Sequence, residues 1–274
     1  MHRTVKVKLL AAVGALVLVA GADGRQEPGG LRLALRADRV SYVLGEPVNL
    51  EIRVLNASPT PVLIPDGADV WVGHLEVLIA SEDVVASEDL VASEDLRYKE
   101  YRGPGWGLRD VAGSGSITLR PGQAHTTQAT ILYNHGVQTD HLNVRRAKEI
   151  FEQYLATGYA LATPGRYRIK ARLYGHRFVH SIESAPIEIT VGEPAGIDRE
   201  VWEVLKTDPQ YGYFIQSGGP KGHPTDPRNL RIVETLGKIA NEQPESRYTE
   251  AIQRSLSKHR EVLEDLRGRG LIGY

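Results

Sequence analysis

Aromatic side chains gather around one glycine-rich segment, and their types suit recognition of a ligand or a partner. The segment GPGWG at 103–107 carries a tryptophan, and other aromatic residues precede it. Aromatic residues on a loop at the end of a β-sandwich provide a large contact area at a small entropy cost. The candidate binding residues are Trp71, Tyr98, Tyr101 and Trp106. Trp106 could equally plug the end of a hydrophobic core, and both interpretations stay open.

Histidines offer a second kind of chemistry, the binding of a metal ion. His176 and His180 are four residues apart and would share one face of a strand, while His135 and His141 flank a turn with Asp140. Zinc needs three or four ligands held together, and no H-E-x-x-H or H-x-H pattern supplies them. We therefore expect no metal site and no cofactor. A metal-dependent enzyme that uses the scattered histidines is kept as an alternative.

Three further patterns associated with enzymes are missing from the sequence. The nucleophile turn G-x-S-x-G does not occur. The glycine-rich stretch 218–222 contains Lys221, but a phosphate loop would need Ser or Thr directly after that lysine. The chain has no cysteine nucleophile either. We expect no catalytic residues and a non-enzymatic protein.

A hexapeptide repeat occupies residues 80–96, where Ala-Ser-Glu-Asp occurs three times. Six residues advance a helix by about 600°, so the repeat leaves no continuous apolar helix face. Deleting two copies leaves HLEVLIASEDLRYKEY, which has the pattern of an ordinary hairpin. The repeat therefore predicts an enlarged hairpin tip. Calcium binding by its carboxylates is the alternative, although the tight Asp-x-Asp spacing and the glycine of calcium loops are absent.

Composition excludes several classes of protein. The chain has 274 residues, of which 41% are hydrophobic and 24% are charged, and these values exclude wholesale disorder. A formal net charge of −1 argues against an electrostatic binder of nucleic acid. The absence of cysteine excludes disulfides, thiolate zinc sites and iron–sulfur clusters.

The first 22 residues have the pattern of a secretory signal peptide. Arg3, Lys6 and Lys8 precede an apolar run over 9–20, and small residues follow at 20–22. The run is shorter than the roughly 20 residues that span a bilayer. We expect export to the periplasm or the extracellular space, with no transmembrane segment after cleavage. Without a cysteine, no lipid anchor is expected, and a cysteine-free exported chain favours a bacterial envelope.

Alternating apolar residues predict a mainly β fold after a flexible lead-in at 23–30. Residues 48, 50, 52 and 54 are apolar and their neighbours are polar, as in a half-buried antiparallel strand. The same alternation recurs at 31–35, 75–79, 127–133, 167–173 and 187–191. We expect an all-β antiparallel sandwich over 31–192, with one helix inserted at 143–157.

A row of basic residues shares one face of the strand at 167–173. The row consists of Arg166, Arg168, Lys170 and Arg172. We expect a solvated face whose charges pair with Glu51 or Glu188 on neighbouring strands.

The hydrophobic period changes to that of helices after Pro194. We expect a small helical region over 196–268, with a loop over 211–228 and a helical hairpin over 229–267. Its second helix carries an apolar stripe at positions 252, 256, 259, 263 and 266. A lone hairpin has a poor core, so we expect it to pack on the sandwich, on the first short helix or on a partner.

Three segments resemble the strand corners of bacterial immunoglobulin-like sandwiches. They are YVLGEPVNLEIRVLN at 42–56, LRPG at 119–122 and PGRYRI at 164–169. The same order is found in the bacterial proteinase-inhibitor sandwich family, so the resemblance implies the fold and leaves inhibition as an alternative function. That family is typically intracellular, whereas this chain has an export signal, an inserted helix and a helical tail. Residues 236–255 are similar to one tetratricopeptide-type hairpin, although stacked repeats need about three copies.

Together these patterns predict an exported, non-enzymatic binding or scaffold protein of the bacterial cell envelope. The expected partner is another envelope protein and not a nucleic acid. A proteinase inhibitor that acts through a sandwich loop, and a metal-dependent enzyme, are the alternatives.

Overall fold

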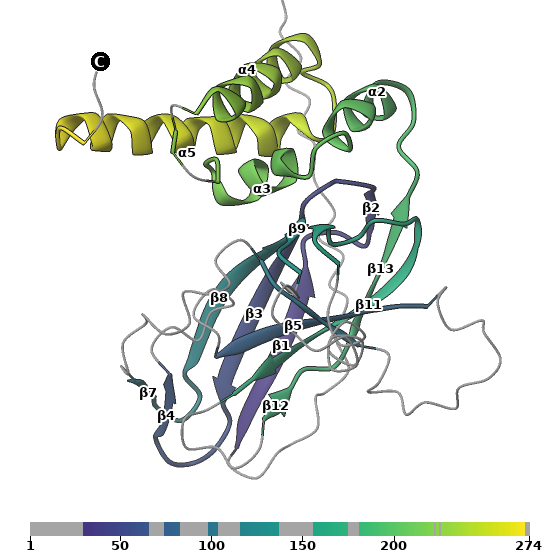
Figure 1. Ribbon diagram of the computed structural model, residues 1–274. Coiled ribbons are helices and arrows are strands. Elements are labelled where there is room, and N and C mark those ends of the chain that lie inside the picture. The colour runs from purple at the N-terminus through teal and green to yellow at the C-terminus, as the bar shows by residue number, and fades with distance from the viewer. Residues whose placement is uncertain are drawn as a thin grey trace, which may run out of the picture.

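The computed structural model describes residues 30–65, 74–82, 98–103, 116–136, 156–174, 181–221, 223–224 and 226–271. This part of the chain holds thirteen strands and four helices, and every strand precedes the first of these helices (Figure 1). The prediction of a strand-rich chain with a helical C-terminal region is thus confirmed. The predicted signal peptide, most of the lead-in, most of the acidic repeat and nearly all of the predicted inserted helix lie outside the described residues.

Three strands form the first sheet, in the order β1-β3-β8. They are β1 (Leu31–Ala37), β3 (Val48–Asn56) and β8 (Ala124–Ile131). Both pairings are antiparallel, and Leu50 lies opposite Ala37 on one side and Ala129 on the other. The apolar residues of the predicted strand at 48–54 are all at most 1% exposed. Their period of two turns them to one face of the sheet, as the sequence predicts.

The second sheet has the order β2-β13-β11-β5-β6, and β12 pairs with β11 beside this path. Its strands are β2 (Ser41–Val43), β5 (Leu75–Ser81), β6 (Lys99–Tyr101), β11 (Gly165–Leu173), β12 (Ile182–Glu183) and β13 (Ile187–Gly192). Short strands make two further pairs, β4 (Val62–Pro65) with β7 (Ser116–Leu119) and β9 (Tyr133–Asn134) with β10 (Gly158–Tyr159). The pairing of β2 with β13 is parallel.

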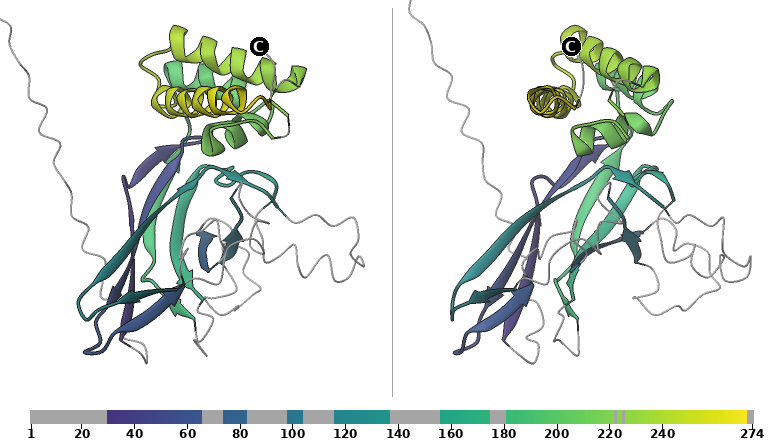
Figure 2. Two further views of the ribbon diagram at one scale, coloured as in Figure 1. Left: turned by 90° about the vertical axis from the view of Figure 1, so that its left-hand side faces the viewer. Right: turned by 60° about the vertical axis from the view of Figure 1, so that its left-hand side comes forward.

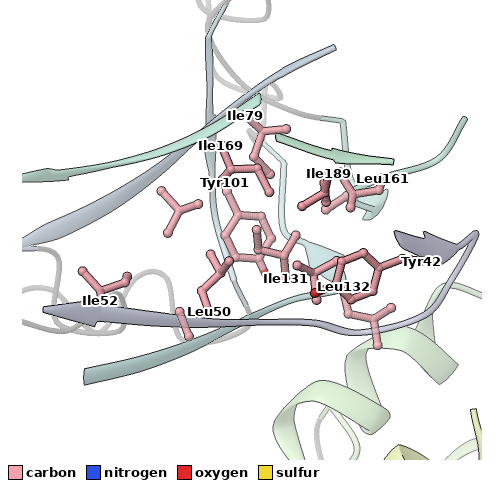
Figure 3. Packing of buried hydrophobic residues seen from close by; sticks show 14 of the residues in the cluster. Tyr42, Leu50, Ile52, Ile79, Tyr101, Ile131, Leu132, Leu161, Ile169 and Ile189 are labelled. Carbon is pink, nitrogen blue, oxygen red and sulfur yellow. The ribbon is translucent and has the colours of Figure 1, made fainter. Parts of the chain in front are cut away.

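The hydrophobic core lies between the two larger sheets, which face each other in Figure 2. Leu50 and Ile52 of β3 lie opposite Ile79 of β5 and Ile169 of β11 (Figure 3). Each of these four side chains is at most 2% exposed. The alternation that the sequence shows in each strand therefore turns one face of each sheet into a shared core.

The basic row on β11 is neutralised by carboxylates. Arg168 lies 3.3 Å from Glu188, and Lys170 lies 2.7 Å from Glu183. The predicted pairing with Glu188 is confirmed. The pairing with Glu51 is wrong, because Glu51 lies on the other sheet and pairs with Arg36.

Four helices follow the strands and gather over one end of the two sheets (Figure 1). They are α2 (Gly196–Leu205), α3 (Gln210–Ser217), α4 (Pro227–Glu242) and α5 (Thr249–Gly268). We call these four helices, together with the loops that connect them, the helical cap. None of the helices in the described ranges is both long enough and apolar enough to cross a bilayer.

The loop predicted over 211–228 is wrong in its first half, where α3 forms. Gly212 and three aromatic residues give this segment a weak intrinsic preference for helix. Packing decides its structure instead, because Phe214 is fully buried and its ring lies 5.2 Å from the ring of His259 on α5. Gly212 is also needed here, since a Cβ at this position would overlap the Tyr159 ring.

Candidate functional site: a polar cleft between the sheets and the helical cap

The predicted aromatic site is only partly within the described residues. Trp71 and Trp106 lie outside them. Tyr98 is half-buried, and the Lys170 ammonium group lies 4.4 Å from its ring centre. Tyr101 is 3% exposed and its ring points into the core (Figure 3). Tyr101 is therefore not an exposed recognition residue: it is the last residue of the short strand β6, and it projects between the sheets.

Tyr101 belongs to a buried polar network that joins the cap to the sheets. Its hydroxyl lies 3.0 Å from the carbonyl oxygens of Thr130 and Tyr133. Burial raises the pKa of the Tyr101 hydroxyl, so the group stays a neutral donor. The Gln216 side chain of α3 also contacts this hydroxyl, and its Nε2 donates to the Thr130 carbonyl at 2.6 Å.

Gln216 completes the network from the helical side. Its Oε1 accepts the backbone N–H of Tyr133 at 2.6 Å. One amide side chain thus satisfies a backbone donor and a backbone acceptor where β8 ends and β9 begins. The sequence gives little sign of this role, because Gln216 falls in a segment with the pattern of a loop.

The helical cap contacts the sheets at the turn between β2 and β3. Gly45 has a φ of +72°, and a Cβ at this position would overlap the indole ring of Trp202 from α2. The Trp202 ring also packs edge-on against Tyr159, with ring centres 4.8 Å apart. From the loop before α5, the Tyr248 hydroxyl donates to the Leu44 carbonyl at 2.5 Å. Residues at 44–45 are therefore held by two separate parts of the cap.

A buried carboxylate strengthens the same junction. The Glu46 side chain is 1% exposed and accepts from Arg39 Nη1 at 2.5 Å and from the Val43 N–H at 3.0 Å. Arg247 of the cap places its Nη2 3.2 Å from the second carboxylate oxygen. A buried charge is tolerated only where paired and hydrogen-bonded, so this arrangement fixes the position of Arg247 against the sheets.

A cleft of about 590 Å³ opens beside this junction, between the sheet β1-β3-β8 and the helices α3 and α5. Its volume lies within the range of small-molecule sites. From the strands and the β1–β2 connection, the cleft is lined by Arg39, Asn49 and Thr130, and from the cap by Arg247, Arg254 and Lys258. The wall is therefore polar and rich in cationic side chains.

Asp38 also faces the cleft, but its oxygens are already engaged. Oδ1 accepts from the Tyr42 hydroxyl at 2.5 Å, and Oδ2 accepts from Asn49 Nδ2 at 3.1 Å. Burial raises the pKa of the Tyr42 hydroxyl, and the hydrogen bond to Asp38 raises it further. Tyr42 thus remains a donor, and it holds the carboxylate of Asp38 in place.

The histidines considered for a metal site are largely outside the described part of the chain, which includes only His135 of that group. Burial lowers the pKa of His135, and the charge of Lys221 lowers it further. His259, buried on α5, also has a lowered pKa because of burial. Within the described ranges, no group of three His, Asp or Glu side chains is arranged to hold a metal ion.

Comparison with known proteins gives no family for this chain. No family model matches it, and no curated protein matches it. A β-glucosidase from Erythrobacter marinus is 13% identical, with a TM-score of 0.29, over 59% of this chain and 15% of the enzyme. The sporulation control protein Spo0M from Bacillus subtilis is 11% identical, with a TM-score of 0.31, over 66% of this chain and 56% of Spo0M.

A third similar structure is the alkylpurine DNA glycosylase AlkC from Pseudomonas fluorescens, which was solved bound to DNA. It is 13% identical, with a TM-score of 0.30, over 62% of this chain and 32% of the glycosylase. The matches thus span between 15% and 56% of the length of these three proteins. Likeness at these TM-scores supports no statement about function, so the chemistry of the cleft has to carry the functional conclusion.

Proposed function

We propose that this protein is an exported, non-enzymatic binding or scaffold module of the bacterial cell envelope, and that it binds in the cleft between the sheets and the helical cap. The observation that carries this proposal is the cleft itself, a polar cavity of about 590 Å³ with walls from two separate parts of the chain. Ligand-binding sites commonly lie at the interface between two parts of a protein.

Rigid walls support a binding role for this cleft. Gln216 and Thr130 line it, and the same two residues belong to the buried network of Tyr101. Glu46 and Arg247 line it as well, and the buried Glu46 carboxylate holds the Arg247 guanidinium in an ion pair. A site with walls held in one arrangement loses little conformational entropy when a ligand binds.

The two facing sheets are assigned, within this proposal, to an immunoglobulin-like sandwich. Antiparallel pairing of every strand in the two sheets except β2, which pairs with β13 in parallel, and a shared apolar core support the assignment. Export and envelope location rest on the signal-peptide pattern at 1–22.

Affinity capture from envelope extract tests the proposed function. The bait is residues 23–274, because removal of the cap would expose Leu44 and the end of the core to water. The informative variant is Thr130→Tyr, which places a ring in the floor of the cleft from strand β8. The matched control is Thr126→Tyr, on the same strand and the same face, about 13 Å away and outside the cleft lining.

A protein held by the parent bait and by Thr126→Tyr, and lost by Thr130→Tyr, is the expected result. Both variants should unfold at denaturant concentrations close to that of the parent chain, because Tyr suits a strand and both sites are at least partly exposed. A protein held equally by all three baits would refute binding in the cleft. If the parent bait holds no protein, a protein partner is refuted.

A further inference from the structure

The acidic groups that face the cleft are already engaged with the protein itself. Glu46 is 1% exposed and accepts from Arg39, from Arg247 and from a backbone N–H. Asp38 accepts from Tyr42 and Asn49. These two carboxylates are therefore not available to a ligand.

The third acid of the cleft is held only weakly. Glu250 lies 2.8 Å from Arg254, four residues further along α5, and its side chain is 86% exposed. Exposed ion pairs of this spacing on a helix contribute little to stability, since water and salt screen them. An anion that enters the cleft can replace Glu250 as the partner of Arg254 with little loss.

The cations of the cleft outnumber the acids that remain. Arg254 is 64% exposed, and Lys258 forms no ion pair with any residue in the described ranges. The stem of Lys258 lies against Gly218 at the end of α3, where a Cβ would overlap it. Gly218 has a φ of +73°, so glycine both ends α3 and makes room for this lysine.

The spacing of these cations suggests what they bind. Arg254 and Lys258 are four residues apart on one face of α5, which is about 6 Å along the helix axis. Arg39 and Arg247 also line the cleft, but both are paired with Glu46, so Arg254 and Lys258 are the cations that a ligand would meet. A ligand with a single charge would use only part of this wall, whereas two or three charges on one small molecule would use both cations of α5.

We propose that the cleft binds a small molecule with more than one anionic group, through Arg254 and Lys258. The proposal rests on the cleft as binding site, and it names the chemical class of the ligand. Carboxylate and phosphate groups share the required charge and hydrogen-bond acceptors, so citrate and inorganic pyrophosphate, each with more than one anionic group, are the two probes. A ligand of this kind could act alone or as the charged part of a larger partner.

Isothermal titration at constant ionic strength tests this ligand class. The variant Arg254→Gln/Lys258→Gln removes both cations that α5 contributes to the cleft. The control Arg260→Gln/Arg267→Gln removes two exposed positive charges from the same helix outside the cleft, so the net charge changes equally. Urea unfolding of both variants should give transitions close to that of the parent chain, because all four side chains are exposed.

Saturable binding of citrate or pyrophosphate by the parent protein is expected. The cleft variant should weaken it by roughly tenfold or more, and the control by less than about twofold. Binding of one probe without the other identifies the anionic group as carboxylate or phosphate. No saturable binding of either probe, or an equal loss in both variants, would overturn the proposal.

Failure of this proposal can be told apart from failure of the proposed function. If neither probe binds but Thr130→Tyr still abolishes capture, the cleft is a binding site for a ligand of another class. If both probes bind and no protein is captured, the anion site stands and the protein partner is refuted.

Discussion

Replacing Gly45 by alanine should uncouple the helical cap from the sheets. Gly45 has a φ of +72°, a left-handed conformation that costs an L-residue about 1–2 kcal/mol. The new Cβ would also overlap ring carbons Cε3 and Cζ3 of Trp202. That ring is 8% exposed and packed edge-on against Tyr159, so it cannot move aside freely. Overpacking of this kind costs about 1–3 kcal/mol in addition.

Gly122 provides a matched control for the backbone term. It has a φ of +75°, and a Cβ there would meet no atom within 4 Å. Gly122→Ala should therefore lower the free energy of unfolding by about 1–2 kcal/mol, from backbone strain alone. Gly45→Ala should lower it by about 1–3 kcal/mol more than that. Urea unfolding followed by circular dichroism measures both values.

A double-mutant cycle assigns the extra loss to Trp202. Trp202→Ala alone should cost about 3–5 kcal/mol, as truncation of a buried tryptophan does. In that background, Gly45→Ala should cost no more than Gly122→Ala does in the parent chain, because the ring it would meet is gone. Equal destabilisation by Gly45→Ala and Gly122→Ala in the parent chain would refute the close contact between Trp202 and Gly45.

Three other perturbations probe the junction. Glu46→Gln removes a buried carboxylate charge and weakens its hydrogen bonds to Arg39 and to the Val43 N–H, so it should lower the free energy of unfolding by about 1–3 kcal/mol in urea. Glu51→Gln, which removes the exposed ion pair with Arg36, should lower the free energy of unfolding by less than about 1 kcal/mol. Tyr101→Phe removes the hydroxyl that donates to two carbonyl oxygens, and it should lower the free energy of unfolding in urea by about 1–2 kcal/mol. Burial lowers the pKa of His259 below its ordinary 6.5 in the folded chain. As the pH drops below about 6.5, this histidine is protonated more readily in the unfolded chain than in the folded one, so the free energy of unfolding should fall. Urea unfolding between pH 5 and pH 8 should show a weaker decline for His259→Gln, and an unchanged decline would contradict this cause.

Much of the strand content follows from local pattern. The alternation at positions 48–54 is sufficient to predict β3, because each apolar residue meets the core at a period of two. Apolar residues at helical spacing likewise predict the helices α4 and α5. Leu236 of α4 and Ile252 of α5 belong to these patterns, and both side chains are fully buried. In these elements the residues of one segment determine both its structure and the face that it buries.

The junction could not be predicted in this way, because its partners are distant in sequence. Gly45 and Glu46 have the pattern of a plain turn, yet Trp202 and Arg247 contact them from the cap. Nothing near residue 46 indicates that its carboxylate will be buried. The cleft depends on the same long-range docking, so none of its walls is visible as a motif.

Tyr101 shows the opposite error, since its neighbours suggest exposure. It lies among aromatic and charged residues before a glycine-rich stretch, which is the composition of a recognition loop. Strand β6 has three residues, too few for a period to appear. Pairing with β5 places Tyr101 opposite Val77 and turns its ring into the core.

Site-specific photocrosslinking in bacterial cells that express the full chain tests binding in the cleft most directly. A photoreactive amino acid would replace Glu250, an exposed residue of the cleft lining that the proposed ligand does not need, or, as control, Lys238 on α4, which is 71% exposed and outside the cleft lining. Binding in the cleft predicts an adduct from position 250 and none from position 238. An adduct from position 238 alone, or equal adducts from both positions, would contradict it.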